Sequence, residues 1–171
     1  MIVERMPVGV VVERRPAQSR WLDHVWRVVA VLPGRPETPE WSVLAEEGGV
    51  IRYYAGTADI TAYSTDTKVY KHNIEAPTPS VYVVLRPGGG PTGWRLLLAT
   101  VDPAEAHSHA DSGSDLLEAL PMPRPIFDWL SAFVATHHVD RPEWRRQRDR
   151  ADPEALAPRI SRHMTEDGHG G

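Results

Sequence analysis

The chain of 171 residues contains no cysteine, and that absence excludes several kinds of chemistry. Disulfide bonds, zinc–thiolate sites, iron–sulfur ligation and thiol catalysis all need cysteine. No run approaches the roughly 20 apolar residues of a membrane-spanning helix. Residues 1–6 also lack the long apolar stretch that opens a signal peptide. We therefore expect a cytoplasmic protein with no membrane partner.

Phenylalanine is scarce, with two residues against six tryptophans, whereas the 41% hydrophobic content suits a packed core. Each tryptophan buries a large area and seeks a partner for its N–H, so we expect several of them to anchor the core. The alternative is a tryptophan exposed in a partner-binding surface. The net charge of −4 disfavours nucleic acid as a partner.

Short runs rich in Val, Trp and Tyr predict β-strands through residues 1–120. The clearest strands are residues 8–15, 25–32, 50–56, 59–64, 81–86 and 94–101; residues 41–45 and 116–120 are shorter candidates, and 68–74 alternates weakly. Segments 50–56 and 59–64 read as a hairpin, as do 81–86 and 94–101. Trp26, Val28, Ala30 and Leu32 are expected on one face of their strand. The fold class is mainly β (α+β), a small antiparallel β-barrel or sandwich of about seven or eight strands.

Two helices and a tail follow from the rest of the sequence. Asp102 and Pro103 suit the N-cap and first position of a short helix at residues 102–107. Residues 125–138 predict an amphipathic C-terminal helix that packs across the sheet or barrel mouth. Its apolar stripe comprises Ile126, Trp129, Leu130, Phe133, Val134 and His137. We divide the chain into a β-rich domain, 1–139, and an Arg-rich, flexible tail, 140–171.

The sequence His107-Ser108-His109-Ala110-Asp111 is the candidate metal motif, with Asp102, Glu105 and Asp115 nearby. A His-x-His-x-Asp run opens the zinc site of some binuclear hydrolases, but those also need an Asp-His pair, whereas Ser112-Gly113 follows here. Residues two apart on a helix face different directions, so both histidines cannot easily share an ion. We therefore expect no metal site and no catalytic residue here.

Other histidines have ordinary explanations. His137 and His138 end the best helix, where the macrodipole stabilises an imidazolium. His72 lies near Tyr70, Asn73 and Glu75, and His24 near Asp23 and Trp26. Such His–acid pairs can perform acid–base chemistry. Adjacent residues on a strand point to opposite faces, however, which disfavours catalysis by either pair.

Two further segments are candidates for binding. Arg86 with Gly88–Gly90 is a possible phosphate loop, but it lacks the Lys-Ser/Thr ending of a P-loop and precedes a strand, so we interpret it as a hairpin turn. The tail carries a tryptophan within cationic side chains, which suits docking on an acidic surface, with RNA as a weaker alternative. These predicted partner-binding residues are Trp144, Arg141, Arg145, Arg146 and Arg148.

The order and spacing of several blocks resemble an uncharacterised bacterial domain family whose genes lie beside molybdenum-dependent formate dehydrogenases. The resemblance covers about residues 6–150. The blocks are PVGVVVERR (7–15), WRVVAVLPG (26–34), YYAG (53–56), PSVYVVLR (79–86), DSG (111–113) and PMP (121–123). Some relatives are labelled molybdopterin-guanine dinucleotide biosynthesis proteins. A guanylyltransferase of that kind needs a Gly-rich N-terminal loop before a helix, whereas this chain begins with a Val-rich strand.

The resemblance implies a role beside a molybdoenzyme. Our leading hypothesis is a non-catalytic accessory or maturation protein for an enzyme such as formate dehydrogenase, without a cofactor of its own. Its partners would be a molybdoenzyme subunit or the maturation factors of that enzyme. One alternative is a stoichiometric small subunit of the dehydrogenase complex. Another is a nucleotide- or cofactor-binding enzyme of molybdenum-cofactor maturation, in which Arg86 and Gly88–Gly90 hold phosphate and Asp111 or Asp115 holds magnesium.

Overall fold

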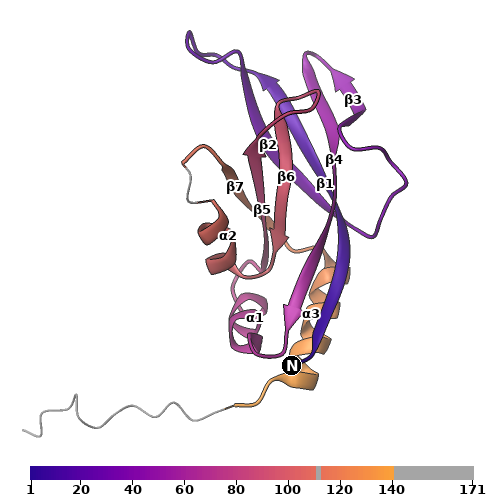
Figure 1. Ribbon diagram of the computed structural model, residues 1–171, viewed down its shortest axis with the longest axis vertical. Coiled ribbons are helices and arrows are strands. Elements are labelled where there is room, and N and C mark those ends of the chain that lie inside the picture. Colours follow the sequence, from indigo (N-terminus) through magenta and orange to yellow (C-terminus); the bar gives the residue numbers. More distant parts are fainter. Residues whose placement is uncertain (111–112, 141–171) are drawn as a thin grey trace, which may run out of the picture. The chain divides into compact units, whose positions relative to one another are not determined.

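Seven strands and three helices make up the protein in the computed structural model, which describes residues 1–110 and 113–140 (Figure 1). They are β1 (Val3–Pro16), β2 (His24–Pro33), β3 (Ser42–Glu47), β4 (Val50–Tyr63), α1 (Thr67–Ile74), β5 (Ser80–Pro87), β6 (Trp94–Thr100), α2 (Pro103–His109), β7 (Leu116–Pro121) and α3 (Arg124–His137). One antiparallel sheet has the order β2-β1-β4-β3 and the other β6-β5-β7. The mainly β, antiparallel fold is confirmed. Within the described residues the two sheets do not close into a barrel.

The core lies between the two sheets. Alternate residues of β1 and β5 enter one hydrophobic cluster, because side chains on a strand alternate between its faces. β4 lies close to β6, and β2 lies close to β7. Between β2 and β7 a side chain makes the contact instead of backbone pairing. The carboxylate of Glu118 in β7 accepts hydrogen bonds from the backbone N–H of Val28 and from Arg27 Nε, both in β2.

Helices and hairpin tips occupy opposite ends of these sheets (Figure 1). The helix end consists of α1 and α3, which pack against each other. The hairpin end consists of the turns that join β1 to β2, β3 to β4 and β5 to β6. The segment Met1–His138, which contains both ends, forms one compact unit.

The prediction of a hairpin from segments 50–56 and 59–64 is wrong, since β4 runs unbroken from Val50 to Tyr63. Gly56 adopts a φ of 139°, a conformation that favours glycine. Val10 and Val11 of β1 pair with Gly56 and Tyr54, so Ala55 is the extra residue of a β-bulge. The small and polar residues that resemble a turn therefore mark a bend within one long strand.

The weak alternation at residues 68–74 does not indicate a strand, because these residues lie in α1. Thr67, Tyr70 and Asn73 are buried, and a spacing of three places them on one face of a helix. The ring of Tyr70 packs edge-on against Phe133 of α3, with centroids 6.3 Å apart. The local sequence pattern of this segment is ambiguous between strand and helix, and packing against α3 stabilises the helix.

The prediction for the core-facing side of β2 is wrong beyond Val28, because the strand contains a β-bulge. Val11 pairs with Ala30 and Val12 with Val28, so Val29 is the extra residue. Trp26 and Val28 face the core as expected, but Val31 replaces Ala30 there, and Leu32 is exposed. One extra residue moves every later side chain to the opposite face.

The remaining elements agree with the sequence. β5 and β6 form the expected hairpin, and β7 is the expected short strand. Asp102 caps α2 by accepting hydrogen bonds from the backbone N–H groups of Ala104 and Glu105. In α3 the predicted stripe is buried or faces the core, apart from His137, whose ring lies 4.6 Å from that of Phe133. Among the described residues no helix is long and apolar enough to cross a membrane.

Candidate docking surface at the hairpin end

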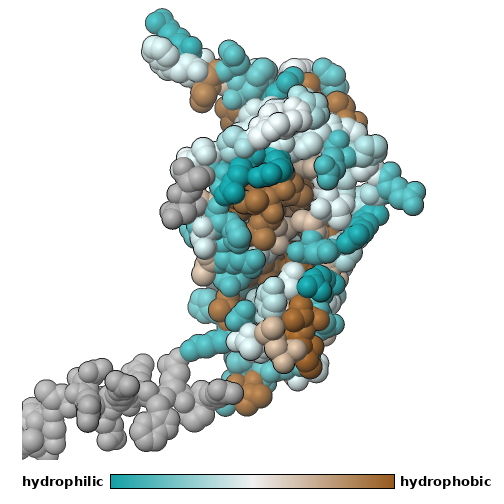
Figure 2. All heavy atoms as spheres, viewed as in Figure 1, coloured by the Kyte–Doolittle hydropathy of each residue, from teal (hydrophilic) through white to brown (hydrophobic). Residues whose placement is uncertain are grey.

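An exposed tryptophan stands at the tip of the β1–β2 hairpin. Trp21 is 90% exposed, and Leu22 and Val25 beside it are also exposed. The strands remain paired up to Pro16 and His24, and the N–H of Ala17 donates to the carbonyl of Asp23 at 3.1 Å. Hydrophobic residues reach the surface on the arm at the upper left of Figure 2. The hairpin therefore presents apolar side chains on an ordered base.

Other tryptophans of this end lie in an aromatic cluster that packs against the core and includes residues of both sheets. The cluster consists of Trp26, Trp41, Tyr53 and Trp94. Trp26 stacks on Tyr53 with ring centroids 5.8 Å apart, and the guanidinium carbon of Arg14 lies 5.9 Å from the centroid of Trp26. The prediction that several tryptophans anchor the core is confirmed for this cluster, which supports the base of the hairpin from within.

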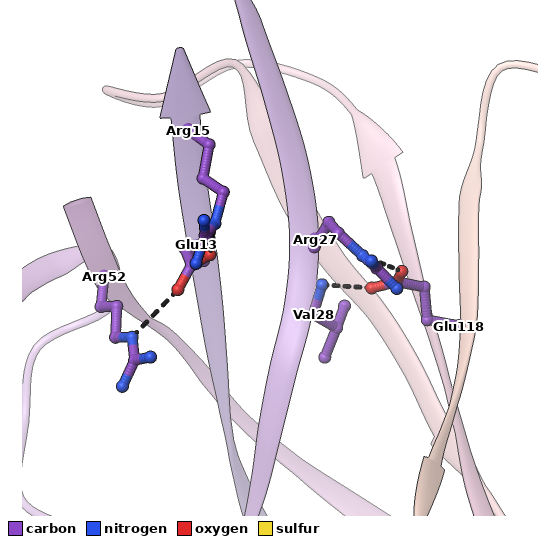
Figure 3. A network of polar contacts seen from close by, with 6 residues as sticks. All are labelled: Glu13, Arg15, Arg27, Val28, Arg52 and Glu118. Carbon is purple, nitrogen blue, oxygen red and sulfur yellow. Dashed lines mark hydrogen bonds and ion pairs between the residues drawn. The ribbon is translucent and has the colours of Figure 1, made fainter. Parts of the chain in front are cut away.

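A buried carboxylate lies on the outer face of the same sheet. Glu13 is only 3% exposed and pairs with two arginines, Arg15 of its own strand and Arg52 of β4 (Figure 3). Arg52 Nε lies 3.1 Å from Glu13 Oε2, and Arg15 Nε donates to Oε1. The hydrogen bond from Arg15 lowers the pKa of the Glu13 carboxyl, burial opposes that shift, and the hydrogen bond from Arg52 adds to it. Glu13 therefore stays ionised at neutral pH.

An open groove of about 330 Å³ adjoins this ion-pair cluster. Strands β1, β3 and β4 provide its walls, since Glu13 pairs across the sheet with Arg52, and Arg52 with Ala45. The lining residues are Glu13, Arg15, Ala45, Glu47, Val50 and Arg52. Beside the groove Val43 and Leu44 of the edge strand β3 are exposed. Charged and apolar side chains are thus accessible together at the hairpin end.

The candidate metal motif lies at the end of α2, and its residues and the acids that flank it make local contacts. The acids that flank it have local partners: Asp102 caps α2, and Glu105 accepts a hydrogen bond from Thr100 at 2.8 Å. His107 Nδ1 lies 2.7 Å from the carbonyl oxygen of Pro103, and His109 is in the last turn of α2. Asp111 lies outside the described residues. Within residues 1–110 and 113–140 no group of three or more His, Asp or Glu side chains is placed to hold a metal ion.

The other histidines of the described residues differ in their surroundings. His24 is exposed at the base of the β1–β2 hairpin, and His72 is exposed on α1 at the helix end. His137 packs against Phe133, and His138 Nδ1 lies 3.0 Å from the hydroxyl of Thr67. His137 and His138 therefore contact different residues, and the contact of His138 joins the end of α3 to α1.

Arg86 and Asp115 do come together, but they bind each other. Arg86 donates to the Asp115 carboxylate through Nε at 3.1 Å and through a terminal nitrogen at 2.8 Å, and also to the carbonyl of His109 at 2.8 Å. The Asp115 side chain is fully buried, and its hydrogen bonds raise the pKa of Arg86. In the adjacent loop the N–H of Gly88 donates to the carbonyl of Gly93. A phosphate on this loop would compete with Asp115 for Arg86.

The predicted docking segment lies outside the described residues. It comprises Arg141, Trp144, Arg145, Arg146 and Arg148.

Sequence reasoning missed Trp21 and the Glu13 cluster. For the Glu13 cluster the sequence did contain a signal, because Glu13 follows a run of valines and precedes two arginines. The pairing of Glu13 with its second partner, Arg52, depends on the register between β1 and β4, which no local sequence pattern reveals.

Comparison with protein families assigns the chain to a family. A family model described as "Protein of unknown function (DUF3305)" matches residues 7–148. The match covers most of the chain, so the protein belongs to this family. The expected membership of an uncharacterised domain family is thereby confirmed. Comparisons with curated proteins and with solved structures found no match.

Proposed function

We propose that this protein is a non-catalytic accessory or maturation protein for a molybdoenzyme such as formate dehydrogenase, and that it binds its partner through the hairpin end. The observation that carries the proposal is Trp21, an exposed tryptophan on a hairpin with a hydrogen-bonded base. The resemblance of the sequence blocks to a family encoded beside formate dehydrogenases supports the choice of partner.

The physics of tryptophan burial supports docking at this hairpin. A buried tryptophan removes about 150–250 Å² from water, which corresponds to about 4–6 kcal/mol before the costs of association. Trp is enriched among the residues that dominate interface energies. Because the paired strands hold the base of the hairpin, less conformational entropy is lost on binding than for a flexible segment.

The use of charged side chains within the fold supports an accessory role. Glu13 pairs with two arginines, Asp115 with Arg86, and Glu105 with Thr100. Each of these acids connects or caps secondary structure elements. Because these acids stabilise the fold, their presence is explained without assigning them a catalytic role.

The Arg-rich tail provides a second contact in this proposal. Trp144 would insert into an acidic groove of the partner, and Arg141, Arg145, Arg146 and Arg148 would pair with its carboxylates. Charge pairing makes such a contact sensitive to salt. Deletion of residues 140–171 should leave the domain folded and weaken partner binding. A loss of many degrees in Tm would instead place Trp144 in the core.

The test is recovery of the dehydrogenase with the tagged full chain from cells that express both. The double variant Trp21→Ala/Leu22→Ala should lower recovery at least tenfold, since two exposed anchors are lost. Val69→Ala, at an exposed position on α1, is the control and should leave recovery unchanged. Equal recovery with the double variant, or no recovery with the wild type at low salt, would contradict the proposal.

Purification of the mature dehydrogenase distinguishes the accessory role from that of a permanent subunit. A maturation factor should be absent from the mature enzyme, whereas a small subunit should remain at a one-to-one ratio through size exclusion. Mass spectrometry of the purified enzyme measures this ratio. Retention at equal stoichiometry would replace the proposed role with the subunit alternative.

A further inference from the structure

The groove beside Glu13 contains two arginines that are oriented by one buried carboxylate. Arg15 and Arg52 each donate to Glu13 through Nε, although their side chains are 58% and 55% exposed. Within residues 1–110 and 113–140 the terminal nitrogens of both guanidinium groups make no hydrogen bond. Glu13 thus restricts both side chains and leaves their other donors for a ligand.

These donors suit a carboxylate. A guanidinium group presents paired N–H groups in a plane, which matches the two oxygens of a carboxylate. One carboxylate and two guanidinium groups give the Glu13, Arg15 and Arg52 cluster a net charge of +1, which Glu47, also in the lining, offsets, so it is the oriented donors rather than excess charge that favour an anion. A volume of about 330 Å³ is enough for a small carboxylate or an acidic side chain.

The rest of the groove defines which anion is favoured. Ala45 and Val50 give it an apolar wall that suits the carbon atoms beside a carboxylate. Glu47 also lines the groove and repels additional negative charge. A monoanion therefore fits better than a phosphate dianion.

We infer that the groove lined by Glu13, Arg15 and Arg52 binds a carboxylate group, carried by a small molecule or by an acidic side chain of a protein. Arg15 and Arg52 are the binding residues, and Glu13 is a positioning residue that acts through them. The inference does not depend on the proposed function, because the groove is complete in this chain alone.

The test is an NMR titration of the full ¹⁵N-labelled chain, following the Arg Nε–H signals at constant ionic strength. Sodium acetate, sodium phosphate and the peptide acetyl-Leu-Asp-Leu-amide are the probes. Acetate should produce saturable shifts at Arg15 and Arg52, and phosphate should bind more weakly than acetate at pH 7.5. Tighter binding of the peptide than of acetate identifies a protein segment as the source, and equal affinity identifies a small carboxylate.

Variants separate a binding role from a folding role. Arg52→Gln should weaken acetate binding about tenfold or more, since it removes a charge-assisted pair of donors. Arg124→Gln is the matched control, because Arg124 also pairs through Nε with a carboxylate, that of Asp128 at 2.9 Å, but on α3. Glu13→Gln should weaken binding, because only the oxygen of its amide can accept a hydrogen bond and one of the two arginines loses the partner that orients it. Circular dichroism checks that this variant is folded. Linear shifts without saturation, tighter phosphate binding, or unchanged affinity in Arg52→Gln would overturn the inference.

Discussion

The helix end and the hairpin end of the sandwich use their side chains differently. At the helix end, Asn73 donates to the carbonyls of Ser80 and Val101 and accepts from the N–H of Ser80, all at 2.9 Å. At the hairpin end, by contrast, Trp21 and Leu22 are exposed, and two arginines border an open groove. We interpret the helix end as the region that secures the fold and the hairpin end as the region that is accessible to partners.

The contacts of the helix end explain its contribution to stability. Ile126, Leu130, Phe133 and Val134 are buried along one face of α3. Phe133 also meets Tyr70 of α1, whose hydroxyl accepts a hydrogen bond from the backbone N–H of Tyr63 at 3.0 Å. α1, α3 and the end of β4 are therefore linked through one pair of aromatic rings.

Phe133→Ala should have the largest effect on stability. Loss of a buried phenylalanine removes its transfer free energy and leaves a cavity, which costs about 3–5 kcal/mol. Urea unfolding monitored by circular dichroism measures the change in the free energy of unfolding. Phe133→Leu, which keeps most of the volume, should lose much less. A loss below about 1 kcal/mol in Phe133→Ala would contradict the role assigned to the helix end.

Glu13→Gln should cost about 1–3 kcal/mol at neutral pH, because both ion pairs are lost and the amide places an NH₂ donor where one of the two acceptor oxygens was. The pKa of Glu13 in the folded protein lies below its usual value of 4.5. Folding therefore gains stability from this group above about pH 4.5 and loses it as the pH falls towards the lowered pKa. The difference between wild type and variant should shrink in that range. A constant difference in urea unfolding from pH 7 to 3 would contradict this assignment.

Most elements of the fold were predictable because their signals are local. The N-cap at Asp102 and the buried stripe of α3 each depend on residues close in sequence. The errors have long-range causes. Gly56 resembles a turn but forms a bulge because β1 pairs with β4 on both sides of it. Residues 67–74 form a helix, one face of which packs against Phe133, some 60 residues later.

The candidate site was less predictable than the fold. Trp21 is one of six tryptophans, and composition alone does not tell which of them is exposed. Its exposure follows from its place beyond the last paired residues of a hairpin. The Glu13 cluster needs the register between β1 and β4, which places Arg52 directly opposite. Binding surfaces made by neighbouring strands therefore appear only after the pairing is known.

Tyr70 tests the helix end at high pH. Burial raises the pKa of its phenol to about 12 from the usual value of 10. Its neutral form is favoured in the folded state, so its contribution is complete below pH 10 and is lost as the pH rises towards 12. Tyr70→Phe should cost about 1 kcal/mol at neutral pH, because the N–H of Tyr63 loses its acceptor. In urea unfolding the variant should lose less stability than the wild type between pH 10 and 12; parallel curves would contradict the raised pKa.

Trp21→Ala should have the smallest effect on stability, within about 0.5 kcal/mol, because an exposed side chain gives up few contacts. Trp26→Ala is the matched control on the same hairpin: its ring stacks on Tyr53 and packs against the core, so it should cost several kcal/mol. Urea unfolding compares the two variants. A large loss in Trp21→Ala would mean that the tip supports the fold, and the distinction between the two ends would no longer hold.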